Sequence, residues 1–353
     1  MIFYSVKDTV LMVLLAVVVD WLVGDPARIP HPVVWIGKLI SRLERVLLRP
    51  GDGARRKRLA GVVLALAVTL ISFGAMWGIA ALATWVHPWL GFAANVWFVS
   101  TTFAVKGLKQ AAMRVYEPLV RGDLKEAREK VGWIVGRDTH SLDEKEVSRA
   151  AVETVAENTV DAFVSPLAFA LLGAAPLAML YRAANTLDSM VGYRNEKYRF
   201  FGWASARLDD VLNWLPARAT GWLLALAAAA GASGAGRASG MGRAGLASWS
   251  GRAGWAGLRA SAGARRAVRK FARLHPSPNS GIPESAVAGA LGIELGGTNR
   301  YGDVVSERAR MGWPLRPLEA GDIVRAVRLL YGVSYIIAGG LLCVWCSLAF
   351  GTG

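Results

Sequence analysis

Three carboxylates recur every four residues in an otherwise apolar stretch of the sequence, at residues 152–191. On a helix, Glu153, Glu157 and Asp161 share one face at this spacing, with Asn158 beside them. Like charges stacked in this way repel one another, and each is costly to remove from water unless a cation, a hydrogen-bond donor or a bound substrate meets it. The spacing therefore predicts a binding site on this face.

A short sequence is repeated within the same stretch: residues 158–164 read NTVDAFV and residues 185–191 read NTLDSMV. In each copy an Asn precedes an Asp by three residues, so an amide oxygen and a carboxylate lie one helical turn apart. Such oxygens suit a hard cation, and the pairs Asn158–Asp161 and Asn185–Asp188 could hold Mg²⁺ against a phosphate. Alternatively, both pairs are ordinary polar helix ends, because Asn caps helices and Asp favours their N-termini.

The composition is typical of a membrane protein. Of the 353 residues, 54% are hydrophobic, which is rich for a soluble chain of this length. The formal net charge of +15 would suit nucleic-acid binding in a soluble protein, but here Lys and Arg cluster beside apolar segments. That pattern favours positive-inside topology. We therefore expect an all-α, polytopic helical membrane protein that contacts lipid and no nucleic acid.

Apolar segments predict membrane helices at residues 9–23, 59–86, 92–105, 211–230 and 331–350. Residues 24–58 predict a basic cytoplasmic loop, in which residues 33–48 form an amphipathic helix that could lie in the membrane interface. Asp25 and His31 fall on the proline-rich start of this loop. A loop histidine is either satisfied by the backbone or available as a base, and both interpretations of His31 stay open.

Residues 106–161 are polar and charged, and they predict a cytoplasmic helical segment. Ser141 precedes Glu144 by three residues, which is the spacing of a capping box, and an amphipathic helix follows. Arg137, Asp138 and His140 precede this helix on a loop. They are therefore expected close to the start of the helix that carries the carboxylates.

The apolar segment at residues 162–181 predicts a broken or re-entrant helix, because Pro166 and Pro176 interrupt it. A complete crossing would place the two Asn–Asp copies on opposite sides of the membrane, whereas a re-entrant segment keeps them together. Irregular backbone at this depth is tolerated where it is buried or lines a cavity. We therefore expect Asp161 and Asp188 on the same side.

The segment after the second copy mixes cations, carboxylates and aromatic residues. Tyr193, Arg194 and Lys197 are candidates for phosphate binding. Asp209 and Asp210 form a candidate patch for a hard metal or an ammonium group, although adjacent Asp residues are also ordinary near a helix start.

Residues 231–275 contain nine Lys or Arg and no acid in a Gly, Ala and Ser background, which predicts a flexible segment facing anionic lipid. Residues 276–318 predict a rigid cytoplasmic loop with a short helix, in which Pro283 suits the first helical position. Free backbone N–H groups at such a start, near Asn279, can bind phosphate. The charge of Glu284 in the first turn equally fits simple capping.

Four blocks of the chain, taken together, resemble the membrane-bound adenosylcobinamide-phosphate synthase family of cobalamin biosynthesis. The blocks are GDPARIPHPVVWIG, GRDTHSLDEKEVSRAAVETVAENTVDAFVSP, YRAANTLDSMVGYRNEKYRFFGWASARLDDVLNWLPAR and HPSPNSGIPESAVAGALGIELGG. They cover a little under a third of the chain. The last block departs from the family pattern, which has an aromatic residue at the position of Ile282 and Ala at those of Ser280 and Ser285.

The resemblance implies an amide ligase of the bacterial inner membrane, with its active face toward the cytoplasm and residues 1–353 in one integral-membrane domain. It would join adenosylcobyric acid, a corrinoid, to (R)-1-aminopropan-2-ol O-phosphate or threonine phosphate, with ATP and Mg²⁺. A carboxylate must be activated before an amine attacks it, and this phosphoryl transfer needs metal and positioned cations. No Walker-type GxxxxGK[ST] occurs, so the ATP site is nonstandard. Other membrane-bound enzymes of the corrinoid pathway are expected partners.

Under this hypothesis, the candidate residues divide into three roles. The catalytic candidates are Glu153, Glu157, His31 and His140, and the metal candidates are Asp161, Asp188 and Glu157. The candidates for contact with substrate or phosphate are Asp25, Arg137, Asp138, Asn158, Asn185, Tyr193, Arg194, Lys197, Asp209, Asp210, Asn279 and Glu284.

Two other functions fit the same residues. A Mg²⁺-dependent membrane prenyl or phosphoalcohol transferase would use the repeated Asn–Asp pattern and the Asp pair to bind a diphosphate, and it would consume no ATP. A non-catalytic corrinoid-binding membrane subunit would bind without turnover.

Overall fold

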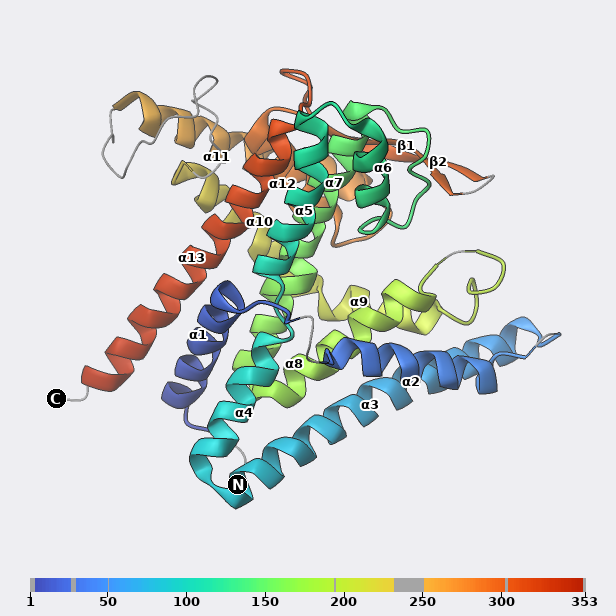
Figure 1. Ribbon diagram of the computed structural model, residues 1–353, viewed down its shortest axis with the longest axis vertical. Coiled ribbons are helices and arrows are strands. Elements are labelled where there is room, and N and C mark those ends of the chain that lie inside the picture. The colour runs from blue at the N-terminus through green and yellow to red at the C-terminus, as the bar shows by residue number, and fades with distance from the viewer. Residues whose placement is uncertain are drawn as a thin grey trace. The chain divides into compact units, whose positions relative to one another are not determined.

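The computed structural model describes residues 4–26, 30–49, 51–193, 195–231, 251–301 and 304–351, of which the side chains of 251–254, 300–301 and 304–305 are left out. Figure 1 shows that most of this chain is helical. The chain divides into two compact units. Unit 1 contains Met1–Ala104, Asp161–Pro216 and Ala338–Gly353, and unit 2 contains Val105–Val160 and Ala217–Ile337. The prediction of one integral-membrane domain stays a prediction, because grouping by contacts does not decide which parts fold independently.

Among the described residues, three helical stretches are long and apolar enough to cross a membrane: Ala54–Val86, Glu144–Val191 and Gly321–Phe350. Apolar side chains on such helices can face lipid directly. The backbone N–H and C=O groups form hydrogen bonds within each helix, so none is left without a partner in the lipid. The prediction of an all-α polytopic membrane protein is therefore confirmed.

Unit 1 is built from α1 (Val6–Leu22), α2 (Pro32–Leu47), α3 (Ala54–Val86), α4 (Pro88–Ser100), α8 (Ser165–Val191) and α9 (Trp203–Leu212). Helix α2 confirms the predicted amphipathic helix, and it packs on α3 and α8. Its start is set by His31, whose Nδ1 accepts a hydrogen bond from Val33 N, and by Pro32 at the first helical position. In the same way His87 ends α3 and caps α4, so the two apolar helices form a tight hairpin.

Helix α8 is broken at Gly173 and Ala174, whose backbone angles are not helical. The rings of Phe169 and Tyr181 are stacked with centroids 5.2 Å apart, and the Tyr181 hydroxyl donates to the main-chain oxygen of Asp161 at 3.3 Å. A straight helix would separate Asp161 from Tyr181 by about 30 Å at 1.5 Å per residue. The two arms of α8 therefore fold back on each other, as the re-entrant prediction requires.

A hydrogen bond to α4 compensates for this break. Asn95 of α4 accepts a hydrogen bond from Ala175 N at 3.2 Å, which satisfies a donor that the broken helix leaves without a carbonyl partner. A five-residue π-helix, Val160–Val164, joins α8 to the preceding helix, and π-helical turns often mark functional sites. A cavity of about 460 Å³ lies beside the break, and its wall is mostly apolar.

Unit 2 contains α5 (Val105–Val120), α6 (Leu124–Gly132), α7 (Glu144–Thr159), α11 (Gly251–Phe271), a 3₁₀ turn (Ala272–Leu274), α12 (Gly281–Leu291), β1 (Glu294–Tyr301) and β2 (Val304–Gly312). Helix α10 (Trp214–Ala229) begins in unit 1 and continues in unit 2, and α13 (Gly321–Phe350) begins in unit 2 and ends in unit 1. Helix α7 confirms the predicted amphipathic helix. Its N-cap is Asp143, whose side chain accepts from Glu146 N, so the capping box predicted at Ser141 and Glu144 was placed two residues early.

The structure corrects two predictions in unit 2. The part of residues 231–275 that the structure describes beyond residue 231 is mainly α11 and not a flexible segment, while residues 232–250 lie outside the described residues. Helix α11 packs closely on α12 because Gly263 and Gly289 face each other: a Cβ on either would lie within 2.4 Å of the other's carbonyl oxygen. The loop predicted at residues 276–318 contains, besides its short helix, the antiparallel hairpin β1–β2. The sequence did not predict this hairpin, because its first strand is rich in glycine and does not alternate apolar with polar residues.

Candidate functional site

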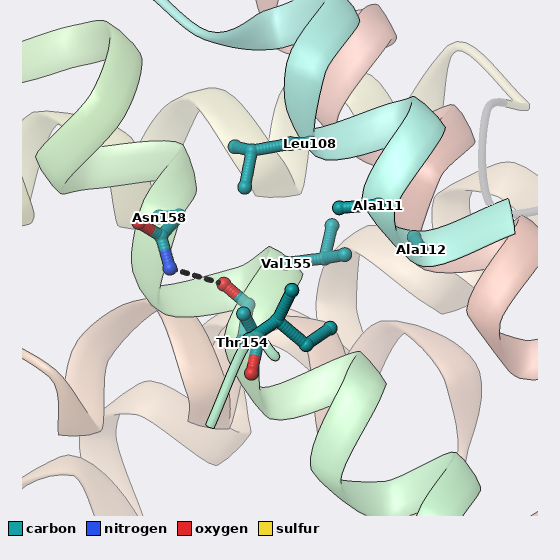
Figure 2. Close-up of a pocket in the computed structure, with 7 residues that line it drawn as sticks. Leu108, Ala111, Ala112, Thr154, Val155 and Asn158 are labelled. Atoms are coloured by element: carbon teal, nitrogen blue, oxygen red, sulfur yellow. Dashed lines mark hydrogen bonds between the residues drawn. The ribbon is translucent and has the colours of Figure 1, made fainter. Parts of the chain in front are cut away.

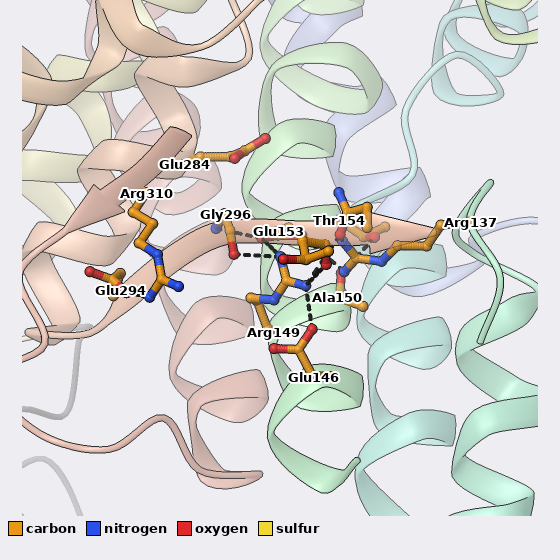
Figure 3. A network of polar contacts seen from close by, with 12 residues as sticks. Arg137, Glu146, Arg149, Ala150, Glu153, Thr154, Glu284, Glu294, Gly296 and Arg310 are labelled. Atoms are coloured by element: carbon orange, nitrogen blue, oxygen red, sulfur yellow. Dashed lines mark hydrogen bonds and ion pairs between the residues drawn. The ribbon is translucent and has the colours of Figure 1, made fainter. Parts of the chain in front are cut away.

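Glu153 lies at the centre of an ion-pair network in unit 2. Its Oε2 lies 3.0 Å from Arg137 Nη2 and its Oε1 lies 3.2 Å from Arg149 Nη1. The side chain of Glu153 is 9% exposed and those of the two arginines are 5% and 3% exposed. Figure 3 shows the contacts converging on Glu153. Each charge in this buried network therefore has a partner of opposite sign, as a stable buried ion pair requires.

The β-hairpin completes this network. Gly296 N donates to Glu153 Oε1 at 2.8 Å, while Arg149 donates to the carbonyl oxygens of Gly296 and Thr298. Asn299 Oδ1 accepts from both Arg137 and Arg149. Gly296 is required here because its φ is +84° and a Cβ would lie 2.2 Å from a backbone oxygen. The hairpin is thus held against α7 by the same carboxylate and arginines.

Three donors bind the carboxylate of Glu153: Arg137, Arg149 and the backbone N–H of Gly296. A carboxylate that is already fully engaged is better suited to holding other groups in position than to accepting a proton. The catalytic role predicted for Glu153 stays a prediction.

A second acidic group follows one turn later on α7. Glu157 is half-buried, and its Oε1 accepts a hydrogen bond from Ser280 Oγ at 2.8 Å. Ser280 ends the loop that begins at His275, and its carbonyl oxygen accepts from Glu284 N at 3.3 Å. Glu157 is therefore connected directly to the start of α12.

Glu284, in the first turn of α12, is 1% exposed, and neither of its carboxylate oxygens has a hydrogen-bond partner among the described residues. Nε2 of His275 lies 3.8 Å from its Oε1. Burial, followed by the charges of Glu153 and Glu157, raises the pKa of Glu284 well above its ordinary value. We refer to Glu153, Glu157, Glu284 and His275 as the glutamate cluster.

The loop before α12 positions His275. Its Nδ1 accepts a hydrogen bond from Ser277 N at 3.0 Å, so the neutral ring carries its proton on Nε2, the atom that faces Glu284. Burial, followed by the positive charge of Arg308, lowers the pKa of His275. Gly281 is required behind this ring, because a Cβ there would lie 2.6 Å from that of His275. Asn279, on the same loop, is buried beside Arg218, whose Nη1 lies 3.4 Å from its Oδ1.

Asn158 lies apart from the glutamate cluster. It lines a cavity of about 190 Å³ whose other walls are mainly apolar, and its Nδ2 donates to Thr154 O at 2.9 Å (Figure 2). The prediction that Asn158 helps to bind a metal ion or the substrate stays a prediction.

In unit 1, the returning arm of α8 packs on α9 and forms a second group of polar side chains. Asn185 Nδ2 donates to Asp209 Oδ1 at 3.3 Å, and Asn213 Nδ2 donates to Asp209 Oδ2 at 2.9 Å. Asn213 Oδ1 accepts from the hydroxyls of Tyr181 and Ser165. Together with Asp188, whose charge acts on Asp209, these residues form what we call the aspartate cluster.

Burial, followed by the charge of Asp188, raises the pKa of Asp209 to about 7. The amide donors of Asn213 and Asn185 offset this shift only in part. Gly192 leaves the room that the Asp188 carboxylate occupies, since a Cβ there would lie 2.0 Å from Asp188 Oδ1. Asp188 therefore lies close enough to Asp209 for its charge to disfavour ionisation of the Asp209 carboxyl group.

Other predicted residues lie elsewhere in unit 1. His31 Nε2 is 3.3 Å from Asp25 Oδ1, and the charges of Asp25 and Asp161 both act on the Arg182 guanidinium. Because His31 Nδ1 caps α2, its ring is occupied at both nitrogens, which favours the backbone-satisfied interpretation. Lys197 is paired with Glu44 at 2.7 Å.

The remaining predicted residues are peripheral in the described structure. Asp138 accepts from His140 N in a local turn, and His140 is exposed. Tyr193 is 47% exposed, and Asp210 lies 3.5 Å from Arg207. Arg194 lies outside the described residues.

No group of three or more His, Cys, Asp and Glu side chains that could hold a metal ion occurs among the described residues. Mg²⁺, however, is usually bound through one or two carboxylates, with the phosphates of a substrate and water completing its shell. Asp188 and Asp209, with the amide side chains of Asn185 and Asn213 beside Asp209, supply the two carboxylates that such a site requires.

Sequence reasoning missed several residues of these sites. Arg149 lies four residues before Glu153 on a helix, a spacing that predicts an ion pair. His275 begins the proline-rich loop that was singled out only for its backbone. Asn299, which joins the network from a hairpin more than 140 residues further along the chain, gave no local signal.

Comparisons with known proteins agree on one family. A family model described as CobD/Cbib protein matches residues 13–330. The chain is 46% identical over 330 residues to cobalamin biosynthesis protein CobD of Klebsiella pneumoniae, covering 92% of this chain and 94% of that protein. It is 47% identical over 327 residues to CobD of Geobacter metallireducens (92% and 93%) and 43% identical over 341 residues to cobalamin biosynthesis protein CbiB of Salmonella typhimurium (97% and 99%). No solved structure matches the chain.

Proposed function

The chain belongs to the CobD/CbiB family of cobalamin biosynthesis proteins, and from this premise we propose that it is an ATP-dependent amide ligase. It joins adenosylcobyric acid to (R)-1-aminopropan-2-ol O-phosphate, or to threonine phosphate, and releases adenosylcobinamide phosphate or its carboxylated analogue. The active face is cytoplasmic, and the membrane is the bacterial inner membrane. The relatives' names support a role in cobalamin biosynthesis, and the reaction is our proposal.

The chemistry requires two steps. First, a corrinoid carboxylate oxygen attacks the γ-phosphorus of ATP, so that ADP leaves and an acyl phosphate forms. Second, the substrate ammonium gives one proton to a base, and the free amine attacks the carbonyl carbon. The carbon–oxygen bond then breaks, phosphate leaves with the electron pair, and the nitrogen loses its second proton to phosphate or water. The protein must therefore bind phosphates, an ammonium group and a large corrinoid.

The observation that carries the proposal is the pair of carboxylates in the aspartate cluster, where burial and the charge of Asp188 raise the pKa of Asp209 to about 7. Mg²⁺, when bound, neutralises the charge that develops on the transferred phosphoryl group. Asp188 and Asp209 would hold it, while Asn185 and Asn213 orient Asp209. Asp161 remains a proposed ligand, although its charge acts on the buried Arg182.

We propose that the glutamate cluster binds the ammonium group of the substrate. Glu157 has one oxygen engaged by Ser280 and is half-buried, so it can still accept hydrogen bonds from a substrate. Both terminal nitrogens of Arg137 bind Glu153 or Asn299 of the hairpin, and Arg149 binds Glu153 and the hairpin backbone, so we assign the two arginines to positioning the hairpin.

The test uses the purified chain in detergent with adenosylcobyric acid, the amino-alcohol phosphate, ATP and Mg²⁺. We expect adenosylcobinamide phosphate by mass spectrometry, with one ADP released per product. Glu157→Gln and Asp188→Asn are expected to abolish product while the protein stays folded in detergent. Turnover of a prenyl diphosphate without ATP would support a transferase, and corrinoid binding without any product would support a binding subunit. Either result would overturn the ligase.

A further inference from the structure

The glutamate cluster contains a carboxyl group that the folded chain buries and leaves without a partner. Glu284 is 1% exposed, and both of its oxygens lack a hydrogen bond from any described residue. In Figure 3 no dashed line reaches Glu284, whereas Glu153 beside it is fully engaged. Such a group costs free energy unless something outside the chain compensates it.

The charges around Glu284 indicate the sign of the missing partner. Helix α7 presents Glu153 and Glu157, β2 presents Arg308, the loop before α7 presents Arg137, and the loop before α12 presents His275. Glu153 already binds Arg137, so that pair adds little net charge. Arg308 offsets the charges of Glu157 and Glu284 only in part, because Glu157 acts on Glu284 more strongly than this arginine does, so a further cation would relieve both acids.

The geometry also indicates what kind of cation fits. A primary ammonium group differs from a metal ion because it carries three N–H donors that take acceptors at hydrogen-bond distance. Carboxylate oxygens on Glu284 and Glu157 meet that need. His275 limits the movement of Glu284, since its Nε2 lies 3.8 Å from Oε1 and its Nδ1 is held by Ser277 N.

Two neighbours of Glu284 are partly exposed to solvent. Ser280 lies one helical turn before Glu284 and binds Glu157, and both Ser280 and Glu157 are half-buried. We propose that Glu284, placed by His275 and completed by Glu157, is the subsite that binds the primary amine of the nucleophilic substrate. This assignment rests on the proposed amide ligase and names the residues that receive its amine.

The test measures steady-state kinetics of Glu284→Gln, which keeps the shape of the side chain and removes its charge. We expect the KM for the amino-alcohol phosphate to rise by about tenfold or more, because a hydrogen bond to a charged group is lost. The KM for MgATP is expected to stay unchanged. The matched control is Glu294→Gln, the same change in the same unit, where the side chain pairs with exposed Arg310 at 2.8 Å. This control should leave both constants unchanged.

A second measurement replaces the amine with hydroxylamine, a small nucleophile that is largely uncharged at neutral pH and traps an activated carboxylate as a hydroxamate. We expect wild type and Glu284→Gln to form corrinoid hydroxamate at similar rates. An unchanged KM for the amine in Glu284→Gln, while hydroxamate still forms, would overturn the amine subsite and leave the ligase intact. If wild type forms neither hydroxamate nor amide, the proposed function itself fails.

Discussion

Tyr181 stacks on Phe169 at a centroid distance of 5.2 Å, although only twelve residues separate them within one apolar segment. The contact exists because the chain reverses at Gly173 and Ala174. The reversal returns the second Asn–Asp copy to the level of the first, so that Tyr181 reaches the backbone of Asp161. A polar group at the start of the segment and one at its end can therefore share one side of the membrane.

Ala174 should be a strained position. Its φ of 51° and ψ of −147° fall in a region that favours glycine, and it is the one residue other than glycine with positive φ in the described chain. Ala174→Gly is expected to stabilise the protein by about 1 kcal/mol, because relief of backbone strain exceeds the added entropy of the unfolded chain. Thermal unfolding in detergent measures it, with Ala170→Gly in the first, helical arm as a control that should destabilise. Equal effects at both positions would argue against strain.

Arg149 should contribute more to stability than any exposed arginine. Arg149→Met leaves Glu153 and the hairpin carbonyls without one of their donors, so we expect a loss of about 3 kcal/mol. Arg310→Gln removes a pair in which the arginine is 67% exposed, and it should cost less than about 1 kcal/mol. Chemical unfolding monitored by tryptophan fluorescence compares the two. Similar losses would show that burial of the network contributes nothing.

The sequence predicted those structural elements that depend on residues close together in the chain. Helices α2 and α7 follow from periodicity and charge, and the i, i+4 spacing correctly placed Glu153 and Glu157 on one side of α7. The interruption of α8 was predicted at Pro166 and Pro176, but it lies at Gly173 and Ala174, while Pro166 is in the first turn of the helix. The hairpin was missed because its pairing is enforced from a distance, by Arg149 and Glu153 binding its backbone. For the same reason, Asn299 could not be assigned to the network, and nothing in the spacing of Glu284 revealed that its carboxyl group is buried without a partner.

The stability of the protein should depend on pH through Glu284. Its pKa is raised in the folded state, so the folded form binds a proton that the unfolded form releases near the ordinary glutamate pKa of about 4.3. Stability is thus fully present below that pH and is lost as pH rises toward the raised folded pKa. Glu284→Gln removes this dependence.

We therefore expect Glu284→Gln to unfold at a higher temperature than wild type at pH 8 and at a similar temperature at pH 5. Differential scanning fluorimetry in detergent at both pH values checks this. A difference that is the same at both pH values would show that Glu284 does not titrate between them.

Mg²⁺ should stabilise the protein through Asp209, and more strongly at high pH. The pKa of Asp209 is raised to about 7, so this carboxyl is protonated in the folded protein at pH 5.5 and charged beside Asp188 at pH 8. Its contribution to stability is lost as pH rises through that range, and a bound cation offsets the loss. We expect Mg²⁺ to raise the unfolding temperature of wild type at pH 8 by a few degrees, with a smaller rise at pH 5.5.

Asp209→Asn should abolish this response, whereas Asp8→Asn, at the start of α1 in the same unit, should retain it. A Mg²⁺ response that survives in Asp209→Asn would place the cation elsewhere.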